Sequence, residues 1–368
     1  MDKYNILIYG MTYNYGGVES VIMNYYRKID RKNIQFDFLC NTQKVAYSDE
    51  IEKLGGKIYR ITARSVNRKK FYSELDEFFK NHSSEYDAIW VNICSLANID
   101  YLKYAKKYGI KKRIVHCHNS QNMDSKLRNI LHVINRLSVD KYATDFWTCN
   151  ADSNNWFYGK KVVKNNKIVE INNAIDVKKY EYNEKTRNRV RKENGWDDKI
   201  VLGNVGRLHF QKNQTFALDI FGEFKKLHEN AIFVLVGDGE DKEMLVQKTK
   251  ELGIEDSVFF YGLRSDVPEL LNGFDILLFP SLFEGLSLVL VESQCAKLLV
   301  MTSNTVSPDT KMSDYIYFLD LNDPASKWAS FMDDKYKKFN RSKVTNQISE
   351  LGYNIDTEAK KLEELLKG

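Results

Sequence analysis

The sequence is poor in cysteine and proline, and its cysteines are not spaced as metal ligands. Its 368 residues include four prolines and five cysteines, and no two cysteines form a Cys-x-x-Cys pair. An odd number of isolated cysteines argues against a disulfide framework and against a zinc knuckle. The cysteine pattern therefore predicts a protein of a reducing cytoplasm.

Long apolar runs are also missing. The best candidate for a membrane span, Gly273–Val291, is interrupted by Asp275, Pro280 and Glu284, so its apolar runs have the length of strands. The segment Met1–Gly10 has no basic stretch followed by a long apolar region, so we expect no signal peptide. These absences favour a cytoplasmic protein without a transmembrane helix.

No charge of one sign dominates the chain. Lys and Arg number 55 against 50 Asp and Glu, which gives a formal net charge of +5. The longest basic clusters, Arg68–Lys70 and Lys111–Arg113, are typical of solvated loops, and we expect no nucleic-acid partner. A composition of 43% hydrophobic and 29% charged residues excludes a disordered chain, and the length suggests two or three domains.

Strand and helix patterns alternate along the whole chain. Short apolar runs predict strands at Tyr4–Tyr9, Ile34–Leu39, Lys57–Ile61, Ala88–Ile93, Arg113–His116, Phe146–Thr148, Ile168–Ile171, Ile200–Val205, Ile232–Val236, Val258–Tyr261, Ile276–Phe279, Leu298–Thr302 and Ile316–Leu319. Helical stretches are predicted between them, notably at Lys70–Lys80, Ile99–Lys107, Lys126–Val139, Thr215–Leu227, Lys242–Leu252, Val267–Asn272 and Leu288–Ala296, and at the terminal Ile355–Leu366. This alternation predicts βαβ units and parallel sheets with right-handed crossovers.

The strand pattern pauses at the polar stretch Asp176–Lys199, which we interpret as the boundary between two doubly wound α/β domains. We predict an N-terminal Rossmann-like domain over 1–175 and a C-terminal Rossmann-like domain over 176–340. A terminal helical segment over 341–368 is expected to cross back to the N-terminal domain. Ligands of such sheets bind outside the carboxyl ends of the strands, so residues just after each strand are the candidates for function.

Two such positions stand out in the N-terminal domain. Gly16 and Gly17 precede a helix, where glycines let a phosphate approach backbone N–H groups and the positive end of the helix dipole. The spacing matches neither G-x-G-x-x-G nor a P-loop, and a plain tight turn is the alternative. His116 and His118 end the fifth strand, and we expect their rings to point to opposite sides, so that at most one reaches a ligand.

In the C-terminal domain, cations follow the first strand. Arg207 and Lys212 precede a helix for which Asn213 is the candidate N-cap. Two cations beside a helix N-terminus predict a diphosphate site, with a solvated basic loop as the alternative.

Two carboxylates follow the strand Ile276–Phe279. Glu284 and Glu292 flank the start of an apolar helix. Because a buried carboxylate is costly without a partner, Glu292 predicts a ligand that offers a pair of hydroxyls. The alternative is a capping acid followed by an exposed helix residue. By contrast, we interpret Gly237-Asp238-Gly239 as a plain turn.

The segment Lys126–Lys141 is amphipathic. Its apolar residues at helical spacing are Leu127, Ile130, Leu131, Ile134 and Leu137, interleaved with Arg128, Arg136 and Lys141. We favour a helix packed on the core. The alternative is a face that meets anionic lipid, where a lipid-linked acceptor resides.

Together these motifs resemble those of the family 4 glycosyltransferases of the GT-B fold, over roughly residues 6–300. The supporting pieces are Gly16-Gly17, Arg207 with Lys212, the E-x7-E pair Glu284 and Glu292, Gly262, and Asn172-Asn173-Ala174-Ile175-Asp176, in which Ala174 replaces a usual glycine. The segment His116–Asn119 and the strand Ile316–Leu319 followed by Trp328 are most similar to capsular and exopolysaccharide members.

The resemblance implies two Rossmann-like domains facing a cleft. It also implies a retaining hexosyl transfer from a nucleotide-sugar donor to a glycan or lipid-linked saccharide acceptor in bacterial surface polysaccharide synthesis. The enzyme would be cytoplasmic, and contact with the inner face of the plasma membrane is a further hypothesis. The implied catalytic residues are Glu284, His118, Arg207 and Lys212.

The same resemblance implies a role for each remaining candidate. Arg207 and Lys212 would hold the donor diphosphate, and Glu292 would accept from the ribose hydroxyls. His118 would contact the donor sugar or the transferred charge. The remaining implied contacts are Glu284 with the backbone of Gly285, Leu286 and Ser287 at the donor sugar and phosphate, Gly262 and Leu263 at the base, and Gly16 and Gly17 at the phosphate.

We expect no metal and no cofactor, since the nucleotide-sugar is a substrate. Metal-dependent sugar transferases typically use a D-x-D tripeptide, and none occurs in the sequence. The stretch Thr302–Asp309 lacks the family's glycine-rich segment, which leaves the donor sugar open. Two other interpretations remain at this point, a nucleotide-sugar epimerase of similar fold and a catalytically inactive partner subunit.

Overall fold

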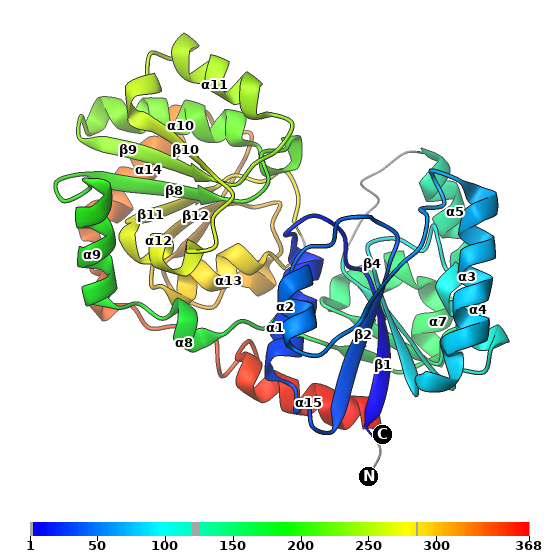
Figure 1. Cartoon of the computed structure of the whole chain (residues 1–368). Helices are drawn as coiled ribbons and strands as arrows, with labels where there is room; N and C mark the ends of the chain where they lie inside the picture. The colour runs from blue at the N-terminus through cyan, green and yellow to red at the C-terminus, as the bar shows by residue number, and fades with distance from the viewer. Residues whose placement is uncertain (1–2, 120–125, 285, 368) are drawn as a thin grey trace. The chain divides into compact units, whose positions relative to one another are not determined.

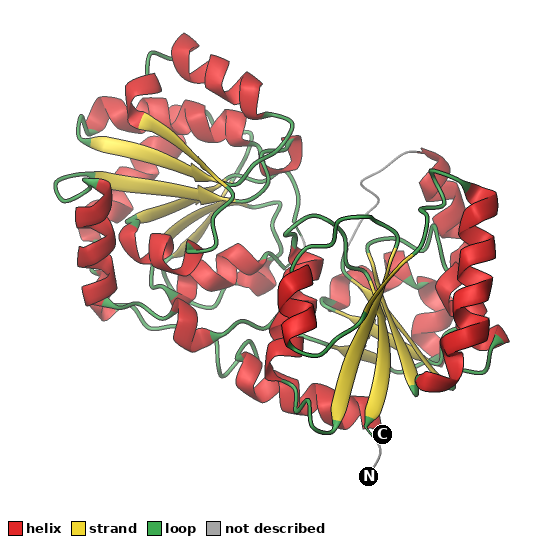
Figure 2. Ribbon diagram, viewed as in Figure 1, coloured by secondary structure: helices red, strands yellow, loops and turns green. Residues whose placement is uncertain are grey.

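The structure is a computed structural model that describes residues 3–119, 126–284 and 286–367. The chain forms two compact units, the first made of Met1–Ala174 and Ile355–Gly368 and the second of Ile175–Asn354. In each unit, helices lie on both sides of a parallel sheet (Figure 2). No helix within the described ranges is long and apolar enough to cross a membrane.

In the described part of the first unit, seven parallel strands lie in the order β3-β2-β1-β4-β5-β6-β7 (Figure 1). The strands are β1 (Tyr4–Tyr9), β2 (Ile34–Cys40), β3 (Ile58–Arg60), β4 (Ala88–Ile93), β5 (Lys112–Cys117), β6 (Asp145–Thr148) and β7 (Ile168–Glu170). The helices are α1 (Gly17–Lys28), α2 (Ser48–Lys53), α3 (Arg68–His82), α4 (Asp100–Lys107), α5 (Lys126–Arg136), α6 (Asn154–Phe157), α7 (Gly159–Asn165) and α15 (Ile355–Lys367). The order places β1, β4 and β5 side by side.

The central strand β4 shows why helices cover both faces of this sheet. Successive strand residues point to opposite faces, and both faces of β4 carry apolar side chains. Trp90 meets Tyr25 of α1 edge-on, with ring centroids 6.4 Å apart. Ile89 and Val91 join a separate core cluster that includes Phe71 of α3. The continuous apolar run of the strand is therefore buried from both sides.

The described part of the second unit holds six parallel strands in the order β10-β9-β8-β11-β12-β13. They are β8 (Ile200–Val205), β9 (Ala231–Val236), β10 (Val258–Gly262), β11 (Ile276–Phe279), β12 (Leu299–Ser303) and β13 (Ile316–Leu319). The helices are α8 (Val177–Tyr180), α9 (Glu184–Asn194), α10 (Gln214–Leu227), α11 (Lys242–Glu251), α12 (Val267–Gly273), α13 (Leu288–Cys295) and α14 (Ala325–Lys338). Helices α10 and α14 contribute to one core cluster, and α9, α12 and α13 to the other.

The thirteen strands predicted from the sequence are confirmed, each with ends within one residue of those observed. The polar stretch Asp176–Lys199 also contains a helix, α9, that the sequence analysis missed. The side chains of Val190 and Arg191 are buried. The sequence of α9 is so rich in charged residues that it shows no helical period of apolar residues. The helix α14 was missed as well.

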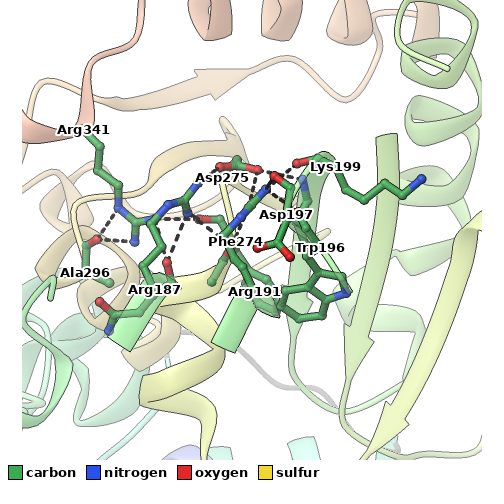
Figure 3. Close-up of polar contacts among 12 residues, drawn as sticks. Arg187, Arg191, Trp196, Asp197, Lys199, Phe274, Asp275, Ala296 and Arg341 are labelled. Atoms are coloured by element: carbon green, nitrogen blue, oxygen red, sulfur yellow. Dashed lines mark hydrogen bonds and ion pairs between the residues drawn. The ribbon is translucent and has the colours of Figure 1, made fainter. Parts of the chain in front are cut away.

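Two arginines of α9 converge on Asp275, just before β11 (Figure 3). Arg187 Nη2 lies 2.5 Å from Asp275 Oδ1, and Arg191 Nη1 lies 3.1 Å from Oδ2. Arg341 donates to the carbonyl oxygen of Phe274, and burial followed by the neighbouring Arg187 lowers its pKa to about 9. This cluster lies at the amino ends of the strands, away from the expected ligand edge, so we assign it a structural role.

Candidate functional site

At the carboxyl edge of the second sheet, the loop after β8 is braced by the loop after β9. Leu208 N donates to Asp238 O at 3.1 Å, and Asp241 N donates to Leu208 O at 3.2 Å. A Cβ on Gly237, whose φ is +136°, would lie 1.9 Å from Gly206 O. The G-x-G turn that we interpreted as plain is therefore what lets the loop carrying Arg207 approach so closely.

The predicted residues Lys212 and Glu284 form an ion pair. Lys212 Nζ lies 2.6 Å from Glu284 Oε1, and the two side chains are only 18% and 10% exposed. The ammonium also lies 4.7 Å from the ring centroid of Phe279, the last residue of β11. The pair holds one positive and one negative charge in a partly dehydrated place, where Coulomb interactions are stronger than in water.

Neighbouring contacts fix the two loops that carry this pair. Leu282 N donates to Gln211 O at 2.8 Å, and Gln211 Nε2 donates to Phe283 O at 2.9 Å. Asn213 is the N-cap residue of α10, as predicted, but its side-chain amide donates to Pro280 O at 3.1 Å instead of capping the helix. The loop after β8 is thereby bound to the loop after β11.

Arg207 belongs to a different ion pair. Its guanidinium lies 3.0 Å from Glu240 Oε2, and both side chains are about half exposed. Such exposed pairs contribute roughly 0–1 kcal/mol and are easily exchanged for another anion. The two predicted diphosphate ligands thus differ, since Lys212 is partly buried with its partner Glu284, whereas Arg207 is paired with the solvated Glu240.

Helix α13 carries the second predicted carboxylate. Burial raises the pKa of Glu292 to about 7, while a hydrogen bond from Tyr180 of α8 and the charge of Lys179 act in the opposite direction. Ser287 is the N-cap residue of α13, and both Leu286 and Ser287 are buried. Gly285, also predicted to contribute backbone to the site, lies outside the described residues.

The residues predicted at the nucleotide base follow β10. Gly262 ends this strand, and its carbonyl oxygen accepts from Gly237 N at 2.8 Å. Leu263 is exposed, with 68% of its surface open to solvent. The loop after β10 is therefore joined to the loop after β9 at the same sheet edge, and an exposed apolar side chain is available beside it.

In the first unit, Gly16 and Gly17 begin α1 but have different surroundings. A Cβ on Gly16 would lie 2.7 Å from Glu19 Oε2, whereas a Cβ on Gly17 would meet no atom within 4 Å. Thr12 Oγ1 donates to Glu19 Oε1 at 2.5 Å, and burial raises the pKa of Glu19. Gly16 makes room for this buried carboxylate. Phosphate binding at the two glycines remains a prediction.

The expectation that His116 and His118 point to opposite sides is wrong. Residues i and i+2 of a strand share a face. Both rings contact Asn92 of β4, with His116 Nδ1 at 3.1 Å and His118 Nε2 at 2.9 Å from Asn92 Oδ1. Burial lowers the pKa of His118 to about 3, so its ring is neutral at physiological pH. Asn92, which joins the two histidines, is a residue that the sequence analysis missed.

The interpretation of Lys126–Lys141 as a core-packed helix is also wrong. On α5 the exposed fractions are 65% for Leu127, 56% for Ile130, 56% for Ile134 and 71% for the following Leu137. The buried contact of α5 is made by a polar residue, His132, whose Nδ1 accepts from Leu96 N at 3.1 Å. The helix docks through His132 and leaves its apolar stripe in solvent.

Comparison with known proteins identifies the family. A family model described as glycosyl transferases group 1 matches residues 186–323. The chain is 28% identical over 323 residues to the putative glycosyltransferase EpsF of Bacillus subtilis (strain 168), covering 86% of this chain and 83% of EpsF. It is 27% identical over 218 residues to the Escherichia coli UDP-Gal:alpha-D-GlcNAc-diphosphoundecaprenol alpha-1,3-galactosyltransferase, covering 54% of each.

Solved structures show the same fold. HepE of Anabaena superposes with a TM-score of 0.79 at 16% identity, over 99% of each chain. WaaG, a glycosyltransferase involved in lipopolysaccharide biosynthesis, superposes with a TM-score of 0.67 at 14% identity, over 98% of this chain and 95% of WaaG. The two parallel α/β sheets are those of the GT-B fold.

The chain therefore belongs to the group 1 glycosyltransferases, also called family 4, and it has the GT-B fold. It is a retaining glycosyltransferase that uses a nucleotide-sugar donor, as the sequence resemblance implied. This identification sets aside the epimerase interpretation, whereas the inactive-subunit interpretation is tested by the turnover assay described below.

Proposed function

We propose that the enzyme transfers a hexosyl group from a UDP-sugar to a saccharide or lipid-linked saccharide acceptor in bacterial surface polysaccharide synthesis. The observation that carries the proposal is the partly buried pair of Lys212 and Glu284 beside the start of α13. Support for the donor and the acceptor comes from the relative named as a UDP-galactose transferase acting on a diphosphoundecaprenol-linked sugar.

In this proposal Lys212 and Arg207 stabilise the leaving nucleoside diphosphate. Negative charge develops on the diphosphate as the glycosidic bond breaks, and cations already in place stabilise it without reorganisation. Lys212 is held by a carboxylate 2.6 Å away, so its ammonium is positioned before the donor arrives. Arg207 exchanges its exposed partner Glu240 for phosphate oxygens.

The remaining donor contacts follow the sequence expectations. Glu292 accepts from the ribose hydroxyls, and backbone near Gly262 and Leu263 contacts the base. Glu284 and the backbone of Leu286 and Ser287 hold the donor sugar and phosphate. Because His118 is neutral, its proposed contact is a hydrogen bond with a sugar hydroxyl and not a cationic one.

Retention of the anomeric configuration requires either a double displacement or attack from the same face of the sugar as the one from which the leaving group departs. A double displacement needs a carboxylate free to act as a nucleophile. Glu284 is engaged by Lys212 and, in the first unit, Glu19 is engaged by Thr12. We therefore propose same-face attack, in which the departing phosphate oxygen takes the proton of the acceptor hydroxyl.

The test is a donor and acceptor panel. Purified enzyme is incubated with UDP-, GDP- and ADP-sugars, each with and without a diphosphoundecaprenol-linked saccharide, and nucleoside diphosphate release is measured. UDP release that depends on the acceptor supports the proposal. Rapid release from another nucleotide-sugar and none from any UDP-sugar would contradict the proposed donor, and release that is indifferent to acceptor would contradict transfer.

We propose further that α5 contacts an anionic membrane surface, where a lipid-linked acceptor resides. The exposed apolar stripe of α5 is accompanied by the exposed cations Lys126, Arg128 and Lys141, a combination typical of helices that lie in a lipid interface. In flotation assays, binding to anionic vesicles should be lost in Ile130→Glu. Leu227→Glu is the matched control, since Leu227 is 52% exposed on α10 against 56% for Ile130. Equal binding of both variants would contradict this contact.

A further inference from the structure

The side chain of Asn92 lies between two histidines and two main-chain carbonyls at the end of β4. Its Nδ2 lies 3.3 Å from Tyr9 O and 3.4 Å from Trp90 O. Both of these atoms can only accept hydrogen bonds, so the amide nitrogen of Asn92 must face them. The orientation of the carboxamide is thereby determined, and its oxygen must face the two imidazoles.

This orientation determines which ring nitrogens carry protons. Asn92 Oδ1 can only accept, and its ring neighbours are His116 Nδ1 at 3.1 Å and His118 Nε2 at 2.9 Å. A lone pair on either nitrogen would face the oxygen lone pairs, so each must be an N–H donor. His116 is therefore the Nδ1–H tautomer and His118 the Nε2–H tautomer.

The surroundings of the rings agree with this assignment. Burial, and then the proximity of His118, lower the pKa of His116 well below its ordinary value, so neither ring is doubly protonated. His116 Nε2 is buried and has no hydrogen-bond partner among the described residues. A buried lone pair there is less costly than an orphaned N–H would be.

The chain leaves room for Asn92. A Cβ on Gly10, whose φ is +137°, would lie 2.7 Å from Asn92 Cβ. Trp90 stacks on His116 with ring centroids 5.7 Å apart, and the two imidazole centroids are 4.1 Å apart. Both rings are thus fixed by packing as well as by the shared amide oxygen.

We propose that Asn92 is a positioning residue that holds His116 as the Nδ1–H tautomer and His118 as the Nε2–H tautomer, which leaves His118 Nδ1 as a hydrogen-bond acceptor. The role of His118 Nδ1 toward a ligand rests on the proposed function, in which His118 contacts a hydroxyl of the donor sugar. A neutral ring with its acceptor nitrogen set in advance favours a ligand group that donates, such as a hydroxyl.

The tautomers can be measured directly in the ligand-free protein. The chain has six histidines, and ring ¹⁵N labelling distinguishes protonated from unprotonated nitrogens. We expect His116 to show Nδ1–H and His118 to show Nε2–H at pH 7. His82 Nδ1 lies 2.7 Å from Glu85 Oε1 and gives a second Nδ1–H signal, which His82→Gln removes. An Nε2–H tautomer at His116 in the wild-type protein would overturn the inference without any variant.

Asn92→Ala should abolish the pure Nδ1–H state of His116. Asn272→Ala is the matched control, because Asn272 is a buried asparagine of α12 in the other unit and should leave both tautomers unchanged. A His116 signal that is identical in Asn92→Ala and in the wild type would overturn the assignment.

Kinetics then test the positioning role separately. Asn92→Ala should lower kcat/KM by about 10- to 100-fold through misplacement of His118, and should cost little more on a His118→Ala background. Equal losses on both backgrounds would overturn the positioning role. If His118→Ala itself leaves kcat/KM unchanged while the tautomers are as assigned, the proposed role of His118 fails and the tautomer assignment stands.

Discussion

The two units gather polar groups at the carboxyl edges of their sheets in different ways. In the first unit the group is neutral, since burial lowers the pKa of both histidines and they share the oxygen of Asn92. In the second unit it is ionic, with Lys212 paired to Glu284 and Arg207 paired to Glu240. A neutral cluster can select hydroxyls, whereas an ionic cluster can stabilise a charged leaving group.

The largest expected effect comes from removing the partly buried cation Lys212. Lys212→Ala should lower kcat/KM by about 10²–10³-fold with a loss in kcat, because it removes a charge that acts on the developing diphosphate and leaves Glu284 without its partner. Lys248→Ala is the control, since Lys248 pairs with Asp219 at 2.8 Å and is 21% exposed, close to the 18% of Lys212. If steady-state kinetics give the two variants the same kcat/KM, the charge-stabilising role proposed for Lys212 is refuted.

Glu292→Gln should weaken donor binding without much effect on kcat. A hydrogen bond to a charged group contributes roughly 1.5–3 kcal/mol, so the donor KM should rise about 10- to 100-fold. A 2′,3′-dideoxy nucleotide inhibitor should lose affinity for the wild-type enzyme and little further affinity for the variant. If the dideoxy analogue loses the same factor against both, the ribose assignment is wrong.

The same variant should also change the free energy of unfolding, by an amount that depends on pH. The pKa of Glu292 is about 7 in the folded protein, above the ordinary value of 4.5, so the folded state binds the extra proton. The stability contributed by the protonated form is complete at low pH and is lost as the pH rises through about 7. The advantage of Glu292→Gln in unfolding free energy should therefore grow by about 2 kcal/mol between pH 5 and pH 8. Thermal melts at both pH values measure this difference, and a difference that stays constant between them would contradict the raised pKa of Glu292.

The exposed pair of Arg207 and Glu240 should matter less than the partly buried pair of Lys212 and Glu284. Arg207→Ala should lower kcat/KM by about tenfold, because the solvated guanidinium contributes less than Lys212. Glu240→Gln should tighten donor binding a few-fold, since it removes the carboxylate that competes with phosphate for Arg207. Donor titrations by calorimetry test both variants. Weaker binding by Glu240→Gln would mean that Glu240 positions Arg207 instead of competing for it.

The smallest expected effect is that of metal removal. The cation role is proposed for Lys212 and Arg207, and no group of three or more metal-ligating side chains occurs in the part of the chain that the structure describes. Turnover should persist in excess EDTA, and added Mg²⁺ should change the rate only by a small factor through product release. Loss of all activity in EDTA, restored by Mg²⁺ or Mn²⁺, would overturn the proposed charge-stabilising roles.

The sequence predicts the sheets well because buried parallel strands are short apolar runs separated by turn residues. It also places Lys212 and Glu284 correctly after their strands, although 72 positions separate them and their 2.6 Å contact is not visible in any pattern. Asn92 was missed because an asparagine inside an apolar strand carries no motif. The apolar period of α5 indicated burial, but the helix docks through His132 instead, which periodicity alone cannot show.

Helix α15 belongs to the first unit but is synthesised after the whole of the second unit. Its buried residues Ile355, Leu362 and Leu366 belong to the first unit, and Asp356 lies 2.8 Å from Lys28 of α1. A ribosome must add roughly 180 residues of the second unit before α15 emerges, a delay of about 10–40 s at common elongation rates. The second unit can therefore complete its core first, while the nascent first unit waits with the α15-binding surface of α1 uncovered and accessible to chaperones.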